Sequence, residues 1–511
     1  MAEVTVIGQG IRKVGIHGGT GCLVNHSGVI MAGIGFELKK IYRNEGISYA
    51  IRGALYSSLV TIGPTIVVIV TILLLYFFLG MSDVSMVSRE LLSSTILYVF
   101  IFSSILTAPF NAVFSRYLAD KFYQEEMSDV LPSYYTGLLL VSFLSMLVAL
   151  PVLLSMYFRG GVDLPFVLAA YGLWASAVIL FFSITYLQAT KDYKIIALFF
   201  FAAMLIGGLF AAVLYFCTSC DQIHSILYGL TAAFFIVAFC EFAYIRAYFR
   251  DDSGSFTECL KYIWRYRMIF LANLFFTLGM YVHNFVFWAT PEHLYAANTF
   301  YSHQAYDLAT CLAVFSNIST TVIFTVVAET RFHETYQKYM ESVVGGTYRQ
   351  IQKNKRIMFH TLSLQLEQVF SLQLAIVCVC YLFLRIFGLY LGFGAMTMTI
   401  YPLLAAAYLG VFIMNCNIIY LYYFEATHEA MLTGFLFCSF TLIGTLISRN
   451  FGVAFYGSGL MLGMLVGFTF SFFCLRRVER NFETHIFCRY KIIDTMKSSA
   501  KGKIVYRKGD Q

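Results

Sequence analysis

The chain is divided into separate runs of about 20 apolar residues, each bounded by charged or turn-forming residues. As a helix, a run of that length spans about 30 Å, the thickness of the hydrocarbon core of a bilayer. Hydrophobic residues make up 59% of the chain and charged residues only 12%, a composition too apolar for one soluble core. The pattern predicts an all-α integral membrane protein with about twelve transmembrane helices in two six-helix bundles. The predicted spans are residues 54–79, 91–114, 134–157, 165–188, 195–216, 226–247, 268–289, 307–328, 368–386, 399–422, 429–447 and 453–475.

Lysine and arginine are distributed unequally between the loops on the two sides of these spans. If the N-terminus is cytoplasmic, the outer side receives only four of the 35 cations, namely Arg89, Arg159, Arg385 and Arg449. Cations resist translocation, so the distribution predicts that both termini are cytoplasmic. The net charge of +7 therefore reports membrane topology, and no nucleic-acid partner is expected.

The spans and loops also predict the domain organisation. Residues 1–30 are rich in glycine and contain no apolar run, so we expect a disordered extension, with Met31 as the physiological start. A cytoplasmic insertion within the second bundle is rich in residues that favour helices, and it is expected to form two short amphipathic helices at the membrane face or against a partner, or else a solvated connector. The predicted segments are a first bundle at 31–247, a linker at 248–267, a second bundle at 268–475 with the insertion at 329–367, and a basic tail at 476–511.

Several polar or helix-breaking residues lie inside the predicted spans, where backbone and side-chain polar groups need partners. Pro64 interrupts the first span and is either a hinge or a static kink. The amides of Asn284, Asn317 and Asn415 either line a polar cavity, where together with aromatic rings they would suit a sugar, or hold helices together. His283, next to Asn284, has a side chain that ordinarily titrates near neutral pH and is a candidate for proton coupling.

Charged residues gather near the predicted span ends, where they could form gating ion pairs or static structural pairs. Glu241 differs from the others because it lies within the sixth span, and it is a second candidate for proton coupling. The charged candidates for a transport path, for gating or for partner docking are Arg52, Arg116, Asp120, Glu241, Asp307, Glu329 and Glu425.

The sequence gives no indication of an enzyme. It contains no Walker A motif, no G-x-S-x-G and no H-E-x-x-H sequence. The longest outer loop has about 17 residues, whereas a folded catalytic domain needs about 50. Cys217 and Cys220 form a lone C-x-x-C, which is weak evidence for a metal. We therefore expect neither catalytic activity nor a bound cofactor or metal.

Six segments, in order along the chain, share the sequence of one protein family. The longest begins at Met31 and reads MAGIGFELKKIYRNEGISYAIRGALYSSLVTIGPTIV. The others are SRYLADKFYQEEMSDVLPSYY, YVHNFVFW, AETRFHETYQKY, LYYFEATHEA and FETHIFC, together with Tyr306 and Asp307 before the eighth span. On these segments the chain resembles the PelG family of Pel exopolysaccharide transport proteins, from residue 31 to about residue 490.

The resemblance implies a twelve-helix transporter of the flippase superfamily, with two bundles around a central cavity. It further implies export of a cationic, N-acetylgalactosamine-rich polysaccharide across the cytoplasmic membrane during biofilm matrix production. A cytosolic glycosyltransferase and other Pel-type membrane subunits would be the partners, one of them sensing cyclic di-GMP in some systems. Many members carry an acid and a lysine where this chain has His283 and Asn284, so a charge pair is not assumed there.

Other functions remain open at this point. A flippase of the same fold could carry lipid-linked oligosaccharides or small cations, and an acidic residue deep in the first bundle would favour a cation; the predicted spans hold none before Glu241. Alternatively, a membrane scaffold could anchor a cytosolic glycosyltransferase through residues 329–367 and transport nothing. A membrane-embedded transferase ranks last, because the acids and histidines are scattered.

Overall fold

A computed structural model describes residues 67–190, 193–218, 220–290, 294–296, 298–324, 330–388, 390 and 392–487. The predicted extension, the part of the first span before residue 67 and the tail beyond residue 487 lie outside the described residues. The same holds for three of the predicted site residues, Arg52, Pro64 and Glu329.

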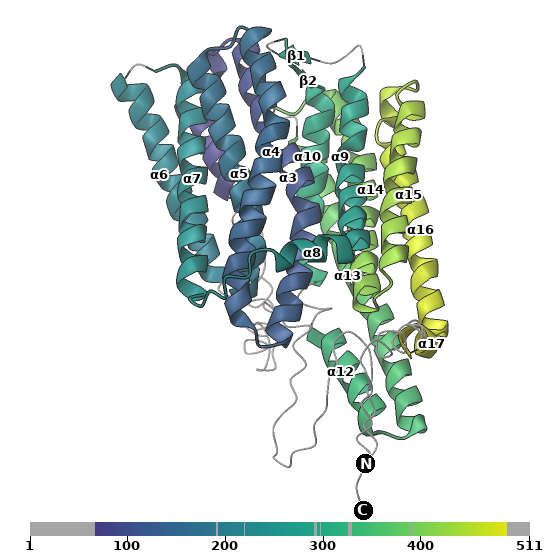
Figure 1. Ribbon diagram of the computed structural model, residues 1–511. Helices are drawn as coiled ribbons and strands as arrows, with labels where there is room; N and C mark the ends of the chain where they lie inside the picture. The colour runs from purple at the N-terminus through teal and green to yellow at the C-terminus, as the bar shows by residue number, and fades with distance from the viewer. Residues whose placement is uncertain are drawn as a thin grey trace, which may run out of the picture.

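The first group of helices packs around one hydrophobic core, seen on the left of Figure 1. Rings from three helices meet in this core, where Tyr134 contacts Phe182 and Tyr186 and is itself fully buried. The group consists of an apolar helix at Val67–Phe78, η2 (Met81–Asp83), α3 (Met86–Tyr123), η3 (Met127–Asp129), α4 (Val130–Phe158), α5 (Leu164–Thr190), α6 (Tyr193–Thr218), α7 (Gln222–Tyr248) and α8 (Glu258–Arg265).

The second group lies on the right of Figure 1 and has two hydrophobic cores of its own. It begins with α9, and a short antiparallel hairpin pairs Leu294 with Ser302. Its elements are α9 (Arg267–Trp288), β1 (Leu294–Ala296), β2 (Phe300–Ser302), α10 (Gln304–Asn317), α11 (Ser319–Phe324), α12 (Thr330–Gly345), α13 (Tyr348–Phe387), α14 (Ala395–Tyr423), α15 (Thr427–Ser448), η5 (Val453–Phe455), α16 (Ser458–Arg480) and α17 (Phe482–Phe487).

Ten helices within the described residues are long and apolar enough to cross a membrane. They coincide with ten of the predicted spans. Of the first span, the described part is the apolar helix Val67–Phe78, and the eighth span is divided into α10 and α11. At this division Ser316 donates to Leu312 O and Asn317 donates to Ala313 O, and such side-chain bonds compete with the helical backbone. The nearly all-helical fold is as predicted, whereas the exact number of twelve spans stays a prediction.

The cytoplasmic insertion differs from its prediction in one respect. Its first amphipathic helix is α12, but the second is not short, because α13 continues without interruption for 40 residues into the ninth span. A capping box fixes its start, with Gln350 N donating to Thr347 Oγ1 and Thr347 N donating to Gln350 Oε1. No glycine or proline follows within the helix to stop it before Gly388.

Glycine allows very close helix packing between α9 and α15. A Cβ atom on Gly434 would lie 2.8 Å from Ala272 O, and one on Gly279 would lie 2.6 Å from Phe437 Cδ1. Small residues are what bring helices together inside a bilayer, where burial of apolar surface gives no driving force between them.

The bundle has two ends, which we name by their contents (Figure 1). The hairpin end carries β1 and β2, and the basic end carries α8, α12 and α17. Among the described cations, those that belong to segments of the hairpin end are Arg89, Arg159, Arg385 and Arg449. These are the four arginines that the sequence assigned to one side of the membrane.

Candidate transport path and gates

Helices α3 and α9 form an aromatic seam between the two groups. Phe102 stacks on Phe285 with ring centroids 5.4 Å apart, and Phe110 meets Phe270 edge to face at 5.1 Å. Ile101 and Ile105 extend the same face of α3 and are buried against α9 residues. The contacts of these residues are between rings and aliphatic chains, so separating the helices here breaks no hydrogen bond between these side chains.

At the hairpin end, Tyr98 of α3 holds the hairpin of the second group. Its hydroxyl donates to Tyr301 O at 2.8 Å and accepts from Tyr301 N at 3.1 Å. Its ring stacks on Trp288 at a centroid distance of 4.7 Å. We call this set, Tyr98 with Tyr301 and Trp288, the hairpin-end contact. Sequence analysis did not select Tyr98, because a tyrosine in an apolar run carries no distinguishing signal.

Asp307, at the start of α10, orients the partner of that tyrosine. Its carboxylate accepts from Trp288 Nε1 at 2.9 Å, from Asn284 Nδ2 at 2.7 Å and from the backbone N–H of His303 at 2.9 Å. Two sequence candidates, Asn284 and Asp307, are therefore in direct contact. Three donors converging on one carboxyl group favour its ionised form and fix the indole against Tyr98.

His283 lies in a separate buried chain of hydrogen bonds. Tyr408 OH donates to Met280 O at 2.9 Å, so it accepts from His283 Nε2, 3.1 Å away. The other ring nitrogen, Nδ1, then accepts from Tyr306 OH at 2.8 Å. Both ring nitrogens are thus occupied by tyrosine hydroxyls, and the imidazole joins α9, α10 and α14.

At the basic end, three charged candidates from the sequence meet around Arg116 of α3. Arg116 Nη2 lies 2.7 Å from Glu425 Oε1, which follows α14, and Arg116 Nε lies 3.5 Å from Asp120 Oδ1. Tyr266 OH donates to Asp120 Oδ2 at 3.3 Å, while its ring lies under the guanidinium at 5.6 Å. Burial raises the pKa of Tyr266 to about 12, so this hydroxyl stays a donor at neutral pH. We call Arg116 with Glu425 the basic-end ion pair; it joins the two groups across the seam.

A second ionic cluster at the basic end was missed by sequence analysis. Lys121 Nζ contacts Glu126 at 2.7 Å and Glu258 at 3.2 Å, and it also contacts Asp129. The lysine is nearly fully buried, and its partners come from the turn before α4 and from α8. The cluster fixes α8 to the first group. It belongs to the segment SRYLADKFYQEEMSDVLPSYY, which carries part of the family resemblance, and that was the available signal.

Glu241 is the buried acid of the first group. It is fully buried within α7, and neither carboxyl oxygen has a hydrogen-bond partner among the described residues. Tyr134 lies close enough to interact with it electrostatically. An acid in this condition is an open acceptor inside the helix group.

The two remaining amides are in different situations. Asn317 donates to Ala313 O and to Ala405 O at 3.0 Å, and so ties α10 to α14. Asn415 is half-buried, and its side chain makes no hydrogen bond within the described part of the chain. Asn317 therefore acts as a link between helices, while Asn415 keeps both of its polar atoms available.

The fold defines the class of this protein, that of the multidrug and toxin extrusion (MATE) transporters. An outward-facing MATE transporter of the MOP superfamily aligns over 84% of this chain and 96% of its own, with a TM-score of 0.59 and 12% identity. The Vibrio cholerae MATE transporter VcmN, in its bent form, covers 90% of this chain and 99% of its own, with a TM-score of 0.56 and 13% identity. The eukaryotic transporter AtDTX14 covers 89% and 98%, at 0.51 and 12%. At these identities the likeness shows the fold alone.

The family is given by the sequence itself. The family model described as "PelG: Putative exopolysaccharide Exporter (EPS-E)" matches residues 31–487, and the chain belongs to this family. The resemblance predicted from the sequence is thereby confirmed. No protein of curated function matches the chain. Family and fold are those of a transporter rather than an enzyme, and the chain is a multi-pass membrane protein.

Proposed function

We propose that this protein exports an exopolysaccharide of the Pel type, rich in N-acetylgalactosamine, across the cytoplasmic membrane during production of a biofilm matrix. The family supports an exopolysaccharide as cargo, and the fold supports transport between two groups of helices. The basic end faces the cytoplasm in this proposal, because cations resist translocation and the hairpin end has four arginines.

One observation carries the proposal most strongly: the seam between the groups is held by a different polar contact at each end. The basic-end ion pair joins α3 to the turn after α14, and the hairpin-end contact joins α3 to β2. Between them lie aromatic rings that can separate without leaving polar groups unpaired. Opening one contact while the other stays closed would give the polymer access from one side at a time.

The hairpin of α12 and α13 is the proposed docking surface for a cytosolic glycosyltransferase. Phe332 of α12 packs on Tyr420 and Tyr423 at the end of α14, with ring centroids 4.9 Å and 5.5 Å away. Tyr336 lies on the same helix near Glu425; burial and the glutamate charge raise the pKa of its hydroxyl to about 12. A partner that moves α12 would therefore act directly beside the basic-end ion pair.

Glu241 is the proposed site of energy coupling. A buried carboxyl group without a partner takes up and releases a cation or a proton at high cost or gain, depending on its surroundings. His283 is the weaker candidate of the two, since both of its ring nitrogens already have partners.

The first test is secretion of polysaccharide by cells that lack this chain, complemented at matched membrane expression with wild type, Arg116→Gln, Glu425→Gln or the charge exchange Arg116→Glu/Glu425→Arg. An ion pair of this exposure biases a two-state equilibrium by about 1 kcal/mol, or about fivefold. We expect each single variant to lower export several-fold, and the exchange to recover part of it. Arg250→Gln is the matched control, since Arg250 is exposed at the same end.

Export that persists without the chain would overturn the proposal. Polymer that is never synthesised in its absence would instead favour the scaffold function, which the projecting α12–α13 hairpin makes the second candidate. Accumulation of lipid-linked oligosaccharide, with normal Pel-type secretion, would favour the flippase alternative.

A further inference from the structure

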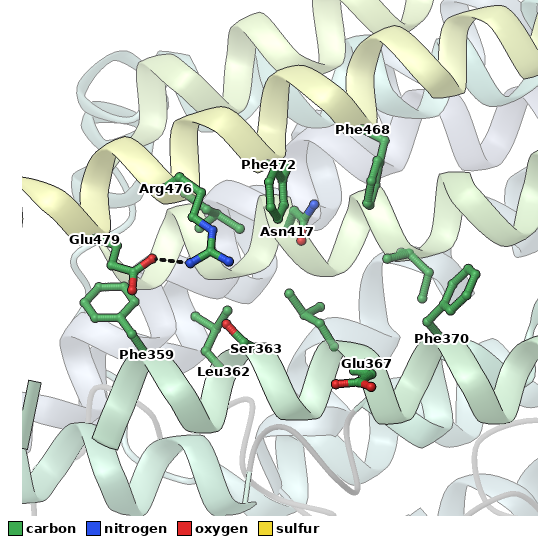
Figure 2. A pocket seen from close by; sticks show the side chains of 13 residues that line it. Phe359, Leu362, Ser363, Glu367, Phe370, Asn417, Phe468, Phe472, Arg476 and Glu479 are labelled. Carbon is green, nitrogen blue, oxygen red and sulfur yellow. Dashed lines mark hydrogen bonds and ion pairs between the residues drawn. The ribbon is translucent and has the colours of Figure 1, made fainter. Parts of the chain in front are cut away.

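A groove of about 460 Å³ lies between α13 and α16, with α14 as its floor (Figure 2). Side chains from α13 and α16 face each other across it, as Phe370 and Phe468 do in Figure 2. Its lining is mainly apolar and is formed by Phe359, Leu362, Ser363, Leu366, Glu367, Phe370, Ile413, Asn417, Phe468, Phe472, Leu475, Arg476 and Glu479. None of these residues belongs to the seam or to either of its end contacts.

The groove opens sideways, toward the hydrocarbon of the bilayer. Phe370 and Phe472 line it and are 44% and 41% exposed, although both belong to membrane-spanning helices. Only 22% of the most apolar window of α13 is buried inside the protein. A volume of this size falls in the range of ligand sites, about 300–1,000 Å³, and an apolar cavity does not hold water. The abundant apolar ligand at this position is an acyl chain.

Polar groups occur at the basic end of the groove and carry both signs of charge. Arg476 Nη1 contacts Glu479 Oε2 at 2.8 Å, and its guanidinium lies 5.3 Å from the centre of the Phe472 ring. Glu367 lies on the opposite wall, on α13 (Figure 2). A headgroup that carries both a phosphate and a cation complements this set, whereas a purely anionic headgroup meets two carboxylates.

The floor of the groove contains an acceptor that the protein does not satisfy. Asn417 Nδ2 donates to Ser471 Oγ at 3.0 Å, but Asn417 Oδ1 is buried and has no hydrogen-bond partner among the described residues. Asn417 itself is 1% exposed. Ser471, its partner, precedes Arg476 by five residues, which is about 7.5 Å along a helix. A ligand with an N–H donor near its headgroup would satisfy this oxygen, and an acyl chain alone would not.

We infer that the groove binds one phospholipid of the leaflet at the basic end, with a headgroup that carries a phosphate and a primary ammonium group. An acyl chain lies between Phe370 and Phe468, the phosphate contacts Arg476, and the ammonium donors face the carboxylates and Asn417 Oδ1. Phosphatidylethanolamine has this chemistry. Phosphatidylglycerol lacks the cation, and phosphatidylcholine lacks an N–H donor. The inference rests on the groove and not on the proposed cargo, so the two can fail independently.

The test uses the full-length protein, released in mild detergent from membranes that contain phosphatidylethanolamine and phosphatidylglycerol, with retained lipids counted by native mass spectrometry. We expect one tightly held phosphatidylethanolamine on the wild type. Leu366→Trp fills the groove and should lower its retention by about tenfold, a loss of about 1.4 kcal/mol in binding free energy. Leu364→Trp is the matched control, because Leu364 is exposed on the same helix and does not line the groove.

Headgroup recognition is tested separately by Arg476→Gln and Glu367→Gln. Each should lower the retention ratio of phosphatidylethanolamine to phosphatidylglycerol toward one, whereas Arg480→Gln, an exposed arginine of the same helix outside the groove, should leave it unchanged. Equal retention of the two lipids by the wild type would overturn the inference. So would undiminished retention by Leu366→Trp.

A fluorescence measurement covers the case in which Leu366→Trp does not fold. Phe370→Trp is a conservative change that places a reporter in the groove, and Phe383→Trp places one on the exposed face of α13. Phosphatidylethanolamine with brominated acyl chains should quench the Phe370→Trp reporter at a lower mole fraction than brominated phosphatidylglycerol does, with no such preference for Phe383→Trp. Equal quenching of the Phe370→Trp reporter by both lipids would contradict the inference.

Discussion

Asp307 receives hydrogen bonds from three different parts of the chain, and through them it determines how the two groups of helices meet. Trp288 and Asn284 belong to α9, while the N–H of His303 lies before α10. The indole that Asp307 holds is the surface on which Tyr98 stacks. A single carboxylate thus supports a contact in which it does not itself take part.

The substitution Asp307→Asn tests this role. An amide offers only one acceptor oxygen to the three donors and turns its own N–H₂ toward at least one of them, so the cost is about 1–3 kcal/mol. We expect a midpoint of thermal unfolding several degrees lower than that of the wild type in detergent. Asp163→Asn is the control, since Asp163 is an exposed acid at the same end. An unchanged midpoint for Asp307→Asn would show that the carboxylate charge is not needed.

Among single residues, sequence analysis found the charges but not all of their partners. Arg116 and Asp120 are one helical turn apart, a spacing visible in the sequence, but their contact with Glu425 bridges more than 300 residues and depends on the tertiary fold. Tyr98 was missed because aromatic residues fill every span of this chain. Lys121 was missed because a lysine near a span end is expected to face water, not three carboxylates.

At the scale of helices, α9 and α15 pack so closely that their glycines determine the contact. Gly434 faces Ala272 O directly. In an exposed helix, alanine in place of glycine stabilises by about 1 kcal/mol, so the sign of the effect here reports the packing.

We predict that Gly434→Ala destabilises the protein, because the new Cβ atom would lie 2.8 Å from a backbone carbonyl oxygen that cannot move away independently. Forced packing of this kind costs about 1–3 kcal/mol, which exceeds the gain in helix propensity. Gly394→Ala is the control, as no atom lies within 4 Å of its Cβ position. Thermal unfolding monitored by size-exclusion chromatography checks both variants, and a raised midpoint for Gly434→Ala would contradict the close contact.

The helix α12 is held by aromatic rings at the end of α14, so Phe332→Ala should release it. Phe332 is 1% exposed, and loss of such a side chain costs about 3–5 kcal/mol. We expect faster amide hydrogen exchange in α12 with little change in the spans, together with weaker capture of the cytosolic glycosyltransferase. Tyr348→Ala, at a position 72% exposed, should change neither. Unaltered exchange in α12 would show that other contacts hold it.

The element-scale predictions from the sequence were good where periodicity and capping were the only determinants. Ten spans and α12 were found from apolar runs and composition. The eighth span was not, because its polar junction around Asn317 divides a run that hydropathy alone treats as continuous. The length of α13 was missed because an amphipathic segment and an apolar segment were assigned to separate helices.

For the molecule as a whole, the arrangement in two groups implies that transport requires their separation at one end at a time. The two end contacts are on opposite ends of the same helix, α3. Rotation of α3 against the second group would therefore affect both.

A reversible cross-link between positions 98 and 301 tests this movement. In a variant without the 12 native cysteines, Tyr98→Cys/Tyr301→Cys would be joined by a short thiol cross-linker that a reductant cleaves. We expect export to fall to the level of cells without the chain and to return on reduction. Each single cysteine variant, treated in the same way, serves as the control. Full export by the cross-linked protein would exclude opening at the hairpin end.

The uninterrupted length of α13 has a mechanical consequence. At 1.5 Å per residue its 40 residues measure about 60 Å, and residues 348–358, before Phe359 meets Phe424 at the end of α14, account for about 16 Å of it. A hydrogen-bonded helix without glycine or proline resists bending, so it behaves as a stiff lever. Any tilt of its intramembrane arm sweeps the outer arm by a proportionate distance, and a protein bound there would register the position of the transporter as a displacement, and could in turn impose one.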